Sequence, residues 1–300
     1  GTYALISLGC PKNLVDSEVM LGCLQRDGCE IVAEAGRADV LVVNTCAFVG
    51  DARRESIDTI LEMAQHKTHG RAQRLVVTGC LAQRHAAELH RAIPEIDALL
   101  GPGQVPLVSA VVRGRAASGP ASAPPTWLYD RTWPRQLATP PYLAYSKIAE
   151  GCDYRCAFCI IPQLRGRYRS RSLRDVVGEA RALAERGVRE LVLVAQDTTR
   201  FGRDRATGES LAGLLRRLGQ VDGLRWIRVM YAYPTTIGDD TLAAIAEEPR
   251  VVKYIDLPLQ HGSPSVLRRM RRPSGRGHGL ALLERIRRRI PGVALRSSFI

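Results

Sequence analysis

Strand-like and helix-like segments alternate along most of this 300-residue chain. The strand-like segments are short runs rich in Val, Ile and Leu, whereas the helix-like segments repeat their apolar residues at helical spacing. Parallel strands require a long crossover, usually a helix, so this alternation predicts an α/β fold with parallel sheets. We expect strands at residues 2–9, 39–45, 74–79, 142–151, 189–197, 225–234, 251–260 and 294–300, and helices at 14–28, 51–66, 82–93, 173–187, 210–223, 239–249, 263–272 and 280–290.

A proline-rich stretch interrupts the alternation. Residues 115–141 contain six prolines in 27 residues and show no periodicity, which is typical of a semi-rigid linker. We therefore expect an N-terminal parallel-sheet domain at residues 1–114, a linker at 115–141 and a second domain at 142–300. The five strand–helix repeats of the second domain suggest an open portion of a (β/α) barrel, in which chemistry takes place at the carboxyl ends of the strands.

Composition favours an ordinary soluble protein, with 45% hydrophobic and 24% charged residues. No run approaches the roughly 20 apolar residues of a membrane span, and the opening residues lack the features of a signal peptide. We therefore expect a cytoplasmic protein without a membrane partner. Because the cytosol keeps thiols reduced, the eight cysteines favour metal or catalytic use over disulfides.

The chain carries an excess of positive charge, with 43 Lys and Arg against 30 Asp and Glu. Residues 268–296 hold ten arginines and a single acidic residue, Glu284. The positive electrostatic field of such a cluster favours binding to a polyanion such as RNA or a ribonucleoprotein. The alternative explanation of the arginines is a coding bias that replaces Lys with Arg. Arg165 and Arg167, in the run LRGRYRSR, are expected either to steer such a target or to be solvated.

The stretch EGCDYRCAFCIIP places Cys152, Cys156 and Cys159 within eight positions, and no cysteine follows. A structural zinc site needs four ligands, and an ordinary ferredoxin cluster uses four thiolates. Three thiolates leave the fourth iron of a 4Fe-4S cube open to an outside ligand, such as a substrate or cofactor. A zinc site completed by a distant histidine remains the alternative.

A second set of three cysteines is spread through the first domain. Cys10, Cys46 and Cys80 each follow a predicted strand, at intervals of 36 and 34 residues. Their thiols can therefore converge on one edge of a parallel sheet, where open α/β folds bind ligands. This pattern favours a second three-thiolate cluster, and three buried core cysteines are the alternative. We expect Cys23 and Cys29 to be packing residues.

The cysteine loop, with Phe158 directly before its third cysteine, resembles that of the radical S-adenosylmethionine (SAM) superfamily. The resemblance implies that S-adenosylmethionine (AdoMet) binds the open iron and that one electron cleaves it to a 5'-deoxyadenosyl radical. Candidate AdoMet contacts are Phe158, Gln196, Asp197 and Gln260, the last three at the ends of predicted strands. Polar residues at such positions can equally be caps or turn formers.

Two three-cysteine sets in this arrangement resemble the methylthiotransferase family over essentially the whole chain. The segments GCPKNLVDSE, NTCAFV, VTGCLAQR, CAFCIIPQLRGRYRSR, LVAQDTTRFG and YIDLPLQHGSPSVLRRMRRP are similar to the branch that modifies an aspartate of ribosomal protein twelve of the small subunit. The tRNA-modifying branch (MiaB type) typically has Gln-Met-Asn where this chain has Pro11, Lys12 and Asn13. A tRNA adenosine methylthiotransferase is the alternative function.

The family resemblance implies two 4Fe-4S clusters and AdoMet as cofactors. It implies that the cluster on Cys152, Cys156 and Cys159 generates a radical that takes hydrogen from the β-carbon of the aspartate. The cluster on Cys10, Cys46 and Cys80 would carry the sulfur, and a second AdoMet would supply the methyl group. The implied partners are the ribosomal protein or the ribosomal subunit, and an electron donor such as flavodoxin.

The chain departs from the family pattern at its end. Family members continue through a glycine-rich segment, a closing strand and helix, and a C-terminal TRAM domain. We therefore expect a barrel truncated before its last strand and before the TRAM domain. A third class of function is a non-catalytic cluster or zinc protein, which would bind metal without cleaving AdoMet.

Overall fold

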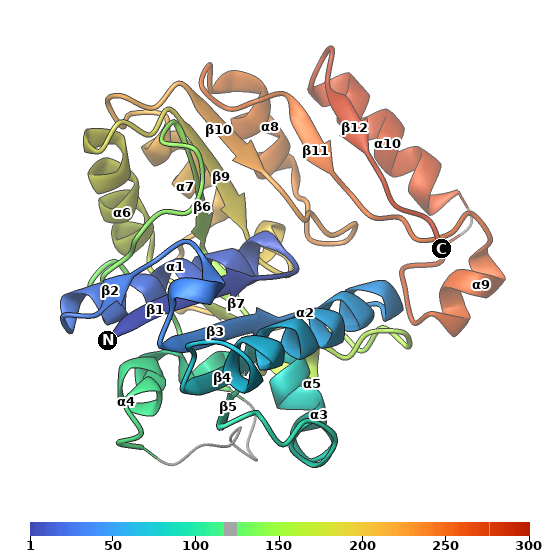
Figure 1. Cartoon of the computed structure of the whole chain (residues 1–300). Coiled ribbons are helices and arrows are strands. Elements are labelled where there is room, and N and C mark those ends of the chain that lie inside the picture. Colours follow the sequence, from blue (N-terminus) through green and yellow to red (C-terminus); the bar gives the residue numbers. More distant parts are fainter. Residues whose placement is uncertain (117–124, 276) are drawn as a thin grey trace. The chain divides into compact units, whose positions relative to one another are not determined.

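The computed structural model describes residues 1–116, 125–275 and 277–300, which divide into two units (Figure 1). Several segments of the chain between residues 127 and 167 alternate between the units, so neither unit is one continuous stretch. Unit 1 comprises Gly1–Trp127, Thr132–Ala138 and Ile160–Gly166, and unit 2 comprises Leu128–Arg131, Thr139–Cys159 and Arg167–Ile300.

Unit 1 is built on a five-stranded parallel sheet with strand order β2-β1-β3-β4-β5. The central strand has the sequence VLVVNT and is buried along its whole length, as expected for a parallel strand covered on both faces. The expected strands at 2–9, 39–45 and 74–79 are confirmed, whereas the short edge strand β5 was not predicted. The strands are β1 (Thr2–Ser7), β2 (Glu30–Ile31), β3 (Val40–Thr45), β4 (Arg74–Gly79) and β5 (Ala98–Leu100).

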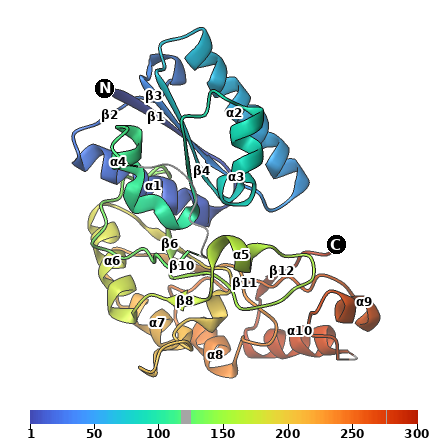
Figure 2. The ribbon, with the colours of Figure 1, turned by 90° about the horizontal axis from the view of Figure 1, so that it is seen from below.

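Helices cover both faces of this sheet (Figure 2). The first helix begins three residues earlier than expected because Pro11, which lacks an N–H donor, occupies its first turn. On the face covered by α2 and α3, a core cluster joins Ile60 and Leu89 of these helices to Leu41 of the sheet. The helices are α1 (Pro11–Arg26), α2 (Gly50–Thr68), α3 (Cys80–Ala92), α4 (Val108–Val112) and the later α5 (Ile161–Arg165), with 3-10 turns at Ala35–Arg37 and Pro102–Leu107.

In its described residues, unit 2 contains four strand–helix units, the last of them with two helices, followed by a final strand, where five repeats were expected. Three parallel strands form a sheet in the order β10-β9-β6, and β11 pairs with β12 in parallel. A parallel bridge between Ile227 and Val251 joins β10 to the segment that leads into β11. The strands are β6 (Leu143–Lys147), β9 (Glu190–Val194), β10 (Trp226–Val229), β11 (Tyr254–Asp256) and β12 (Ala294–Arg296).

The main helices of unit 2 follow one another along the same side of its strands (Figure 2). Two of them begin with serine caps, since Ser172 and Ser210 accept hydrogen bonds from backbone N–H groups of the first turn. The helices are α6 (Leu173–Glu185), α7 (Leu211–Leu218), α8 (Asp239–Glu247), α9 (Pro264–Arg269) and α10 (His278–Arg289), with a 3-10 turn at Thr198–Arg200.

The expected strand at 142–151 is divided in the structure. Its last part, β7 (Ala149–Glu150), leaves the parallel sheet and pairs antiparallel with β8 (Arg169–Ser170). The cysteine loop therefore begins from a short hairpin-like pair and not from the end of the sheet strand itself.

No helix in the described ranges is both long and apolar enough to cross a membrane.

Candidate functional site

The three cysteines of unit 1 lie just beyond neighbouring parallel strands. Cys10 follows β1 and precedes the first residue of α1, Cys46 follows β3, and Cys80 follows β4 as the first residue of α3. Because β1, β3 and β4 are adjacent in one parallel sheet, all three cysteines lie at the same edge of it. The structure thus brings together the residues that the sequence pattern grouped.

Two glycines allow the chain to turn tightly at these cysteines. Gly9 has a φ of +88°, and a Cβ there would lie 2.7 Å from the Cβ of Cys46. Gly79 has a φ of +94°, and a Cβ there would lie 2.4 Å from Oδ1 of Asn44 and 2.6 Å from the carbonyl oxygen of Thr45. Both positions therefore exclude any other residue without a local rearrangement.

Side-chain amides and a serine fix the strand ends. Nδ2 of Asn13 donates to the carbonyl oxygen of Leu8 at 2.7 Å, and Nδ2 of Asn44 donates to that of Asn13 at 2.9 Å. The backbone N–H of Cys46 donates to Oγ of Ser56 at 3.0 Å. These bonds tie α1, β3 and α2 to one another around the thiols.

Burial and nearby cations set the thiol chemistry of this set. Burial alone would raise the pKa of Cys10, but the charges of Lys12 and Arg165, together with the backbone N–H groups of Asn13 and Lys12, lower that pKa. Burial raises the pKa of Cys46 and of Cys80, and Arg165 opposes the rise at both. A cation beside all three sulfurs favours their thiolate forms, which are the forms that bind metal.

Arg165 is buried, in contrast to the expectation from the sequence. Its side chain is only 2% exposed, so the prediction that it is solvated or steers a target is wrong. Arg167, two residues later, has a side chain that is 91% exposed. A local run of arginines does not reveal which member is buried, because burial depends on packing elsewhere in the fold.

The second set of cysteines lies on the loop between β7 and α5. Cys152, Cys156 and Cys159 are all partly exposed, and the N–H of Cys159 donates to the carbonyl oxygen of Cys156 at 3.0 Å. Burial, followed by the neighbouring thiols, raises the pKa of Cys152 to about 11 although the N–H of Tyr154 opposes the shift. Phe158 is 41% exposed on the same loop.

A buried carboxylate supports this loop. Asp197 has no exposed surface, and its carboxylate accepts hydrogen bonds from the hydroxyls of Tyr154, Thr199 and Thr236 at 2.8, 2.5 and 2.8 Å. The hydroxyl of Tyr168 donates to its backbone carbonyl oxygen at 2.9 Å. Asp197 therefore anchors the tyrosine that lies two residues after the first cysteine of the loop.

An aromatic stack and a buried arginine adjoin the same loop. The rings of Tyr154 and Tyr233 are stacked with centroids 3.9 Å apart, and the guanidinium of Arg272 lies 4.3 Å from the Tyr233 centroid. Nη1 of Arg272 approaches Sγ of Cys156 at 3.9 Å, while its Nη2 donates to the carbonyl oxygen of Pro258. This cysteine set also has a buried cation beside it.

Gln196 presents an unsatisfied polar atom near the loop. Its Nε2 donates to Glu150 at 3.0 Å, and Glu150 is paired with Lys147 at 2.6 Å. Its Oε1 is buried and has no hydrogen-bond partner among the described residues, which fits a polar ligand at this strand end. Gln260 follows β11 with a φ of +75°, and its N–H donates to the carbonyl oxygen of Ser298 at 2.9 Å.

The donor sets fit iron–sulfur clusters better than single ions. All eight cysteines are thiols, and in the described parts of the chain no three Cys, His, Asp or Glu side chains converge where one ion would sit. A cluster takes one thiolate on each of several irons, so its ligands need not converge on a single point. Three thiolates with a buried cation beside them therefore suit a cluster in each unit.

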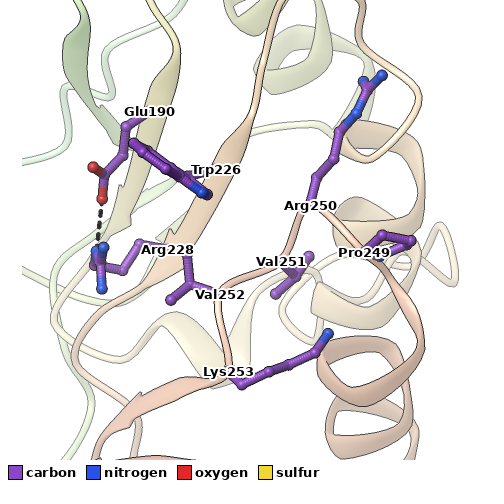
Figure 3. A pocket seen from close by; sticks show the side chains of 8 residues that line it. All are labelled: Glu190, Trp226, Arg228, Pro249, Arg250, Val251, Val252 and Lys253. Atoms are coloured by element: carbon purple, nitrogen blue, oxygen red, sulfur yellow. Dashed lines mark hydrogen bonds and ion pairs between the residues drawn. The ribbon is translucent and has the colours of Figure 1, made fainter.

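A cavity of about 340 Å³ lies elsewhere in unit 2, at the amino ends of its strands (Figure 3). Glu190 and Trp226, the first residues of β9 and β10, line it together with Arg228, whose Nε donates to Glu190 at 2.7 Å. The strands of this sheet are parallel, so the cavity and the cysteine loop lie at opposite strand ends. The cavity is therefore not part of the candidate site.

Comparisons with known proteins agree with this geometry. Residues 2–101 match the uncharacterized protein family UPF0004, and residues 146–299 match the radical SAM superfamily. Proteins named ribosomal protein uS12 methylthiotransferase RimO are 54% identical in Symbiobacterium thermophilum and 49% identical in both Pelotomaculum thermopropionicum and Desulforamulus reducens. The chain belongs to the RimO family of radical SAM methylthiotransferases. The matches cover 98 to 100% of the chain, which spans 61 to 68% of the length of these RimO proteins.

Solved structures show the same fold at low identity. The radical SAM methyltransferase TsrM from Kitasatospora setae gives a TM-score of 0.65 at 16% identity, covering 99% of this chain and 67% of that one. The cobalamin-dependent radical SAM enzyme OxsB gives 0.67 at 12% identity, covering 100% and 49%. These likenesses confirm the expected α/β architecture, and the family match of residues 146–299 confirms the radical SAM domain.

Several residues that lie beside the two cysteine sets were not expected from the sequence to lie there. Tyr154, Tyr233 and Arg272 adjoin the loop of unit 2, and Lys12 and Arg165 adjoin the thiols of unit 1. Position near a cysteine could have identified Tyr154 and Lys12. Tyr233, Arg165 and Arg272 offered no local signal, because their contacts join segments that are distant along the chain.

Proposed function

We propose that this chain is the catalytic part of a radical SAM methylthiotransferase that adds a methylthio group to the β-carbon of an aspartate in ribosomal protein uS12. The observation that carries the proposal is the presence of two three-cysteine sets, one in each unit, in a chain 54% identical to a protein named RimO. A single set would suit any radical SAM enzyme, whereas the second set requires a further role for a cluster.

The six cysteines would hold the cofactors. Cys152, Cys156 and Cys159 would bind one 4Fe-4S cluster, and Cys10, Cys46 and Cys80 would bind the other, each leaving one iron without a protein ligand. When bound, the first cluster supplies the electron that cleaves AdoMet, and the second supplies an iron that carries sulfur. An unactivated C–H bond resists acid and base catalysis at neutral pH, which is why this substrate calls for radical chemistry.

Residues around the loop would bind and orient AdoMet. The unpaired Oε1 of Gln196 would accept a hydrogen bond from a donor group of the cofactor, and Glu150 holds that side chain in place. Phe158 and Gln260 remain proposed contacts. The carboxylate of Asp197 is occupied by three hydroxyl donors and the N–H of Thr199, so we propose that it acts by fixing Tyr154 and the loop.

The units would correspond to the functional domains. We propose that unit 1 carries the sulfur-bearing cluster, that unit 2 is the radical SAM domain, and that residues 115–141 connect them. We further propose a cytoplasmic location, the ribosomal protein or the small subunit as the macromolecular partner, and a one-electron donor such as flavodoxin.

The function can be tested by mass spectrometry of uS12. The chain, reconstituted anaerobically with iron and sulfide, is incubated with AdoMet, a reductant and uS12, and we expect one methylthio group on an aspartate-containing peptide. The Cys156→Ala variant should give neither the modified peptide nor 5'-deoxyadenosine, because one of three cluster ligands is lost. Methylthiolated tRNA with unmodified uS12 would instead indicate the tRNA-modifying function. Bound iron without any AdoMet cleavage would indicate a non-catalytic protein.

A further inference from the structure

The buried arginine of unit 1 is held in place by the hydrophobic core. Arg165 is the last residue of α5, a short helix that follows the radical SAM cysteine loop in sequence but belongs to unit 1. The preceding residue, Leu164, is 3% exposed and packs into the core cluster of unit 1, with Ile160 packed against that cluster. This apolar anchoring fixes the backbone from which the guanidinium extends.

The guanidinium connects the first helix to the thiols. Nη1 of Arg165 pairs with Oδ2 of Asp16 at 2.8 Å, and its Nη2 donates to Oδ1 of Asn13 at 3.1 Å. Both partners are on α1, the helix that begins directly after Cys10. Nδ2 of Asn13 in turn donates to the carbonyl oxygens of Leu8 and Thr45, which lie shortly before Cys10 and directly before Cys46. One planar guanidinium is therefore tied through α1 to the segments that carry two of the candidate cluster ligands.

The charge of Arg165 acts on all three thiols of this set. It favours the thiolate of Cys10, Cys46 and Cys80 in each case, by opposing the effect of burial on the pKa. Asp16 balances the charge of Arg165 in the chain itself. Three thiolates on an iron–sulfide core form an anion, and one-electron reduction makes that anion more negative, so a buried cation beside it stabilises the reduced form.

We propose that Arg165 is a positioning residue for the cluster on Cys10, Cys46 and Cys80, where its buried charge sets the reduction potential. The inference rests on the proposed function, because it requires a cluster on these three cysteines. It assigns to α5 a role in the cofactor site of unit 1, although this segment follows the cysteine loop of the other set.

A second buried arginine of unit 1 provides a matched control. Arg135 pairs with Glu18, also on α1, with Nε and Nη2 at 2.8 and 2.5 Å from Oε2. The side chains of Arg135 and Glu18 are 5% and 0% exposed, so this ion pair is as buried as the pair of Arg165 and Asp16. Arg165 is among the charges that most affect the pKa values of the three thiols, whereas Arg135 is not among them. A purely structural role would make the two arginines equivalent.

The test measures the potential of this cluster alone. Cys152, Cys156 and Cys159 are replaced with Ala in the full chain, and Arg165→Met, Arg165→Lys and Arg135→Met are compared by iron content and redox titration. In Arg165→Met we expect the ratio of reduced to oxidised cluster at a fixed potential to fall at least about tenfold. For a one-electron couple, this fall corresponds to a reduction potential that is more negative by about 59 mV. Arg165→Lys should recover part of the shift because it restores the charge, and Arg135→Met should leave the potential unchanged.

The outcomes separate this inference from the proposed function. If the parent chain with the three Ala substitutions binds no iron, the proposed function fails and the role of Arg165 fails with it. The role of Arg165 would be overturned, with the proposed function intact, if Arg165→Met left the potential unchanged. It would also be overturned if Arg165→Met and Arg135→Met had equal effects on potential or iron content. Loss of iron in Arg165→Met, with iron retained in Arg165→Lys and Arg135→Met, would support it.

Discussion

Replacing Asp197 with alanine is expected to lower the free energy of unfolding of unit 2 by about 3 to 5 kcal/mol. The carboxylate is fully buried and accepts hydrogen bonds from Tyr154, Thr199 and Thr236. Its removal leaves the hydroxyl of Tyr154 and the N–H of Thr199 without their acceptor, and it takes one partner from the hydroxyls of Thr199 and Thr236. Each unsatisfied buried group costs about 1 to 3 kcal/mol before relaxation. Urea unfolding followed by hydrogen exchange and mass spectrometry would report on the two units separately.

The control for this substitution is an exposed carboxylate of the same unit. Asp222→Ala should change the free energy of unfolding by no more than about 0.5 kcal/mol, as is usual for surface sites. Protection of unit 2 should be reduced in Asp197→Ala while that of unit 1 is retained. Equal urea midpoints for the Asp197 and Asp222 variants would show that the hydrogen-bonded cluster does not support the loop.

Substitution of Gly79 is expected to damage unit 1 and its cluster together. At a φ of +94°, a methyl group would meet Oδ1 of Asn44 at 2.4 Å and the carbonyl oxygen of Thr45 at 2.6 Å. Gly79→Ala should therefore lower the free energy of unfolding of unit 1 by at least about 3 kcal/mol, which combines backbone strain with overpacking. Because Gly79 immediately precedes Cys80, we also expect the iron bound by this set to fall to less than half.

Gly28 offers a matched comparison within the same unit. It also has a positive φ, of +78°, but a Cβ there would meet no atom within 4 Å. Gly28→Ala should therefore lower the free energy of unfolding by only about 1 kcal/mol, the cost of the left-handed backbone, with iron content unchanged. Similar losses in both variants would mean that the close approach at Gly79 is unimportant for the site.

Much of the fold could be predicted because the strands carry an unambiguous signal. The run VLVVNT of β3 is apolar enough to be a buried central strand, and the cysteines that follow β1, β3 and β4 must share an edge once those strands are parallel. By contrast, β5 has only three residues, Ala98–Leu100, too few for any periodicity to be seen. Pro11 is typical of a first helical position and indicates the early start of α1.

The electrostatic part of the candidate site could not be predicted from local sequence. Arg165 and Arg167 lie in the same arginine-rich run, yet one is buried and the other exposed. The difference depends on Asp16 and Asn13, about 150 residues earlier in the chain, which supply the partners for a buried guanidinium. Asp197 was predicted to be a candidate cofactor contact for its polarity, and only the structure shows that Tyr154 and two threonines occupy its carboxylate.

The most direct test of two independent three-thiolate clusters is the iron and acid-labile sulfide content per chain after anaerobic reconstitution. We expect about eight irons in the parent chain and about four when either Cys152, Cys156 and Cys159 or Cys10, Cys46 and Cys80 are replaced with Ala, because each cluster holds four irons. About four irons in the parent, falling to none when the first set is replaced and unchanged when the second is replaced, would contradict this account. Cys10, Cys46 and Cys80 would then be core residues.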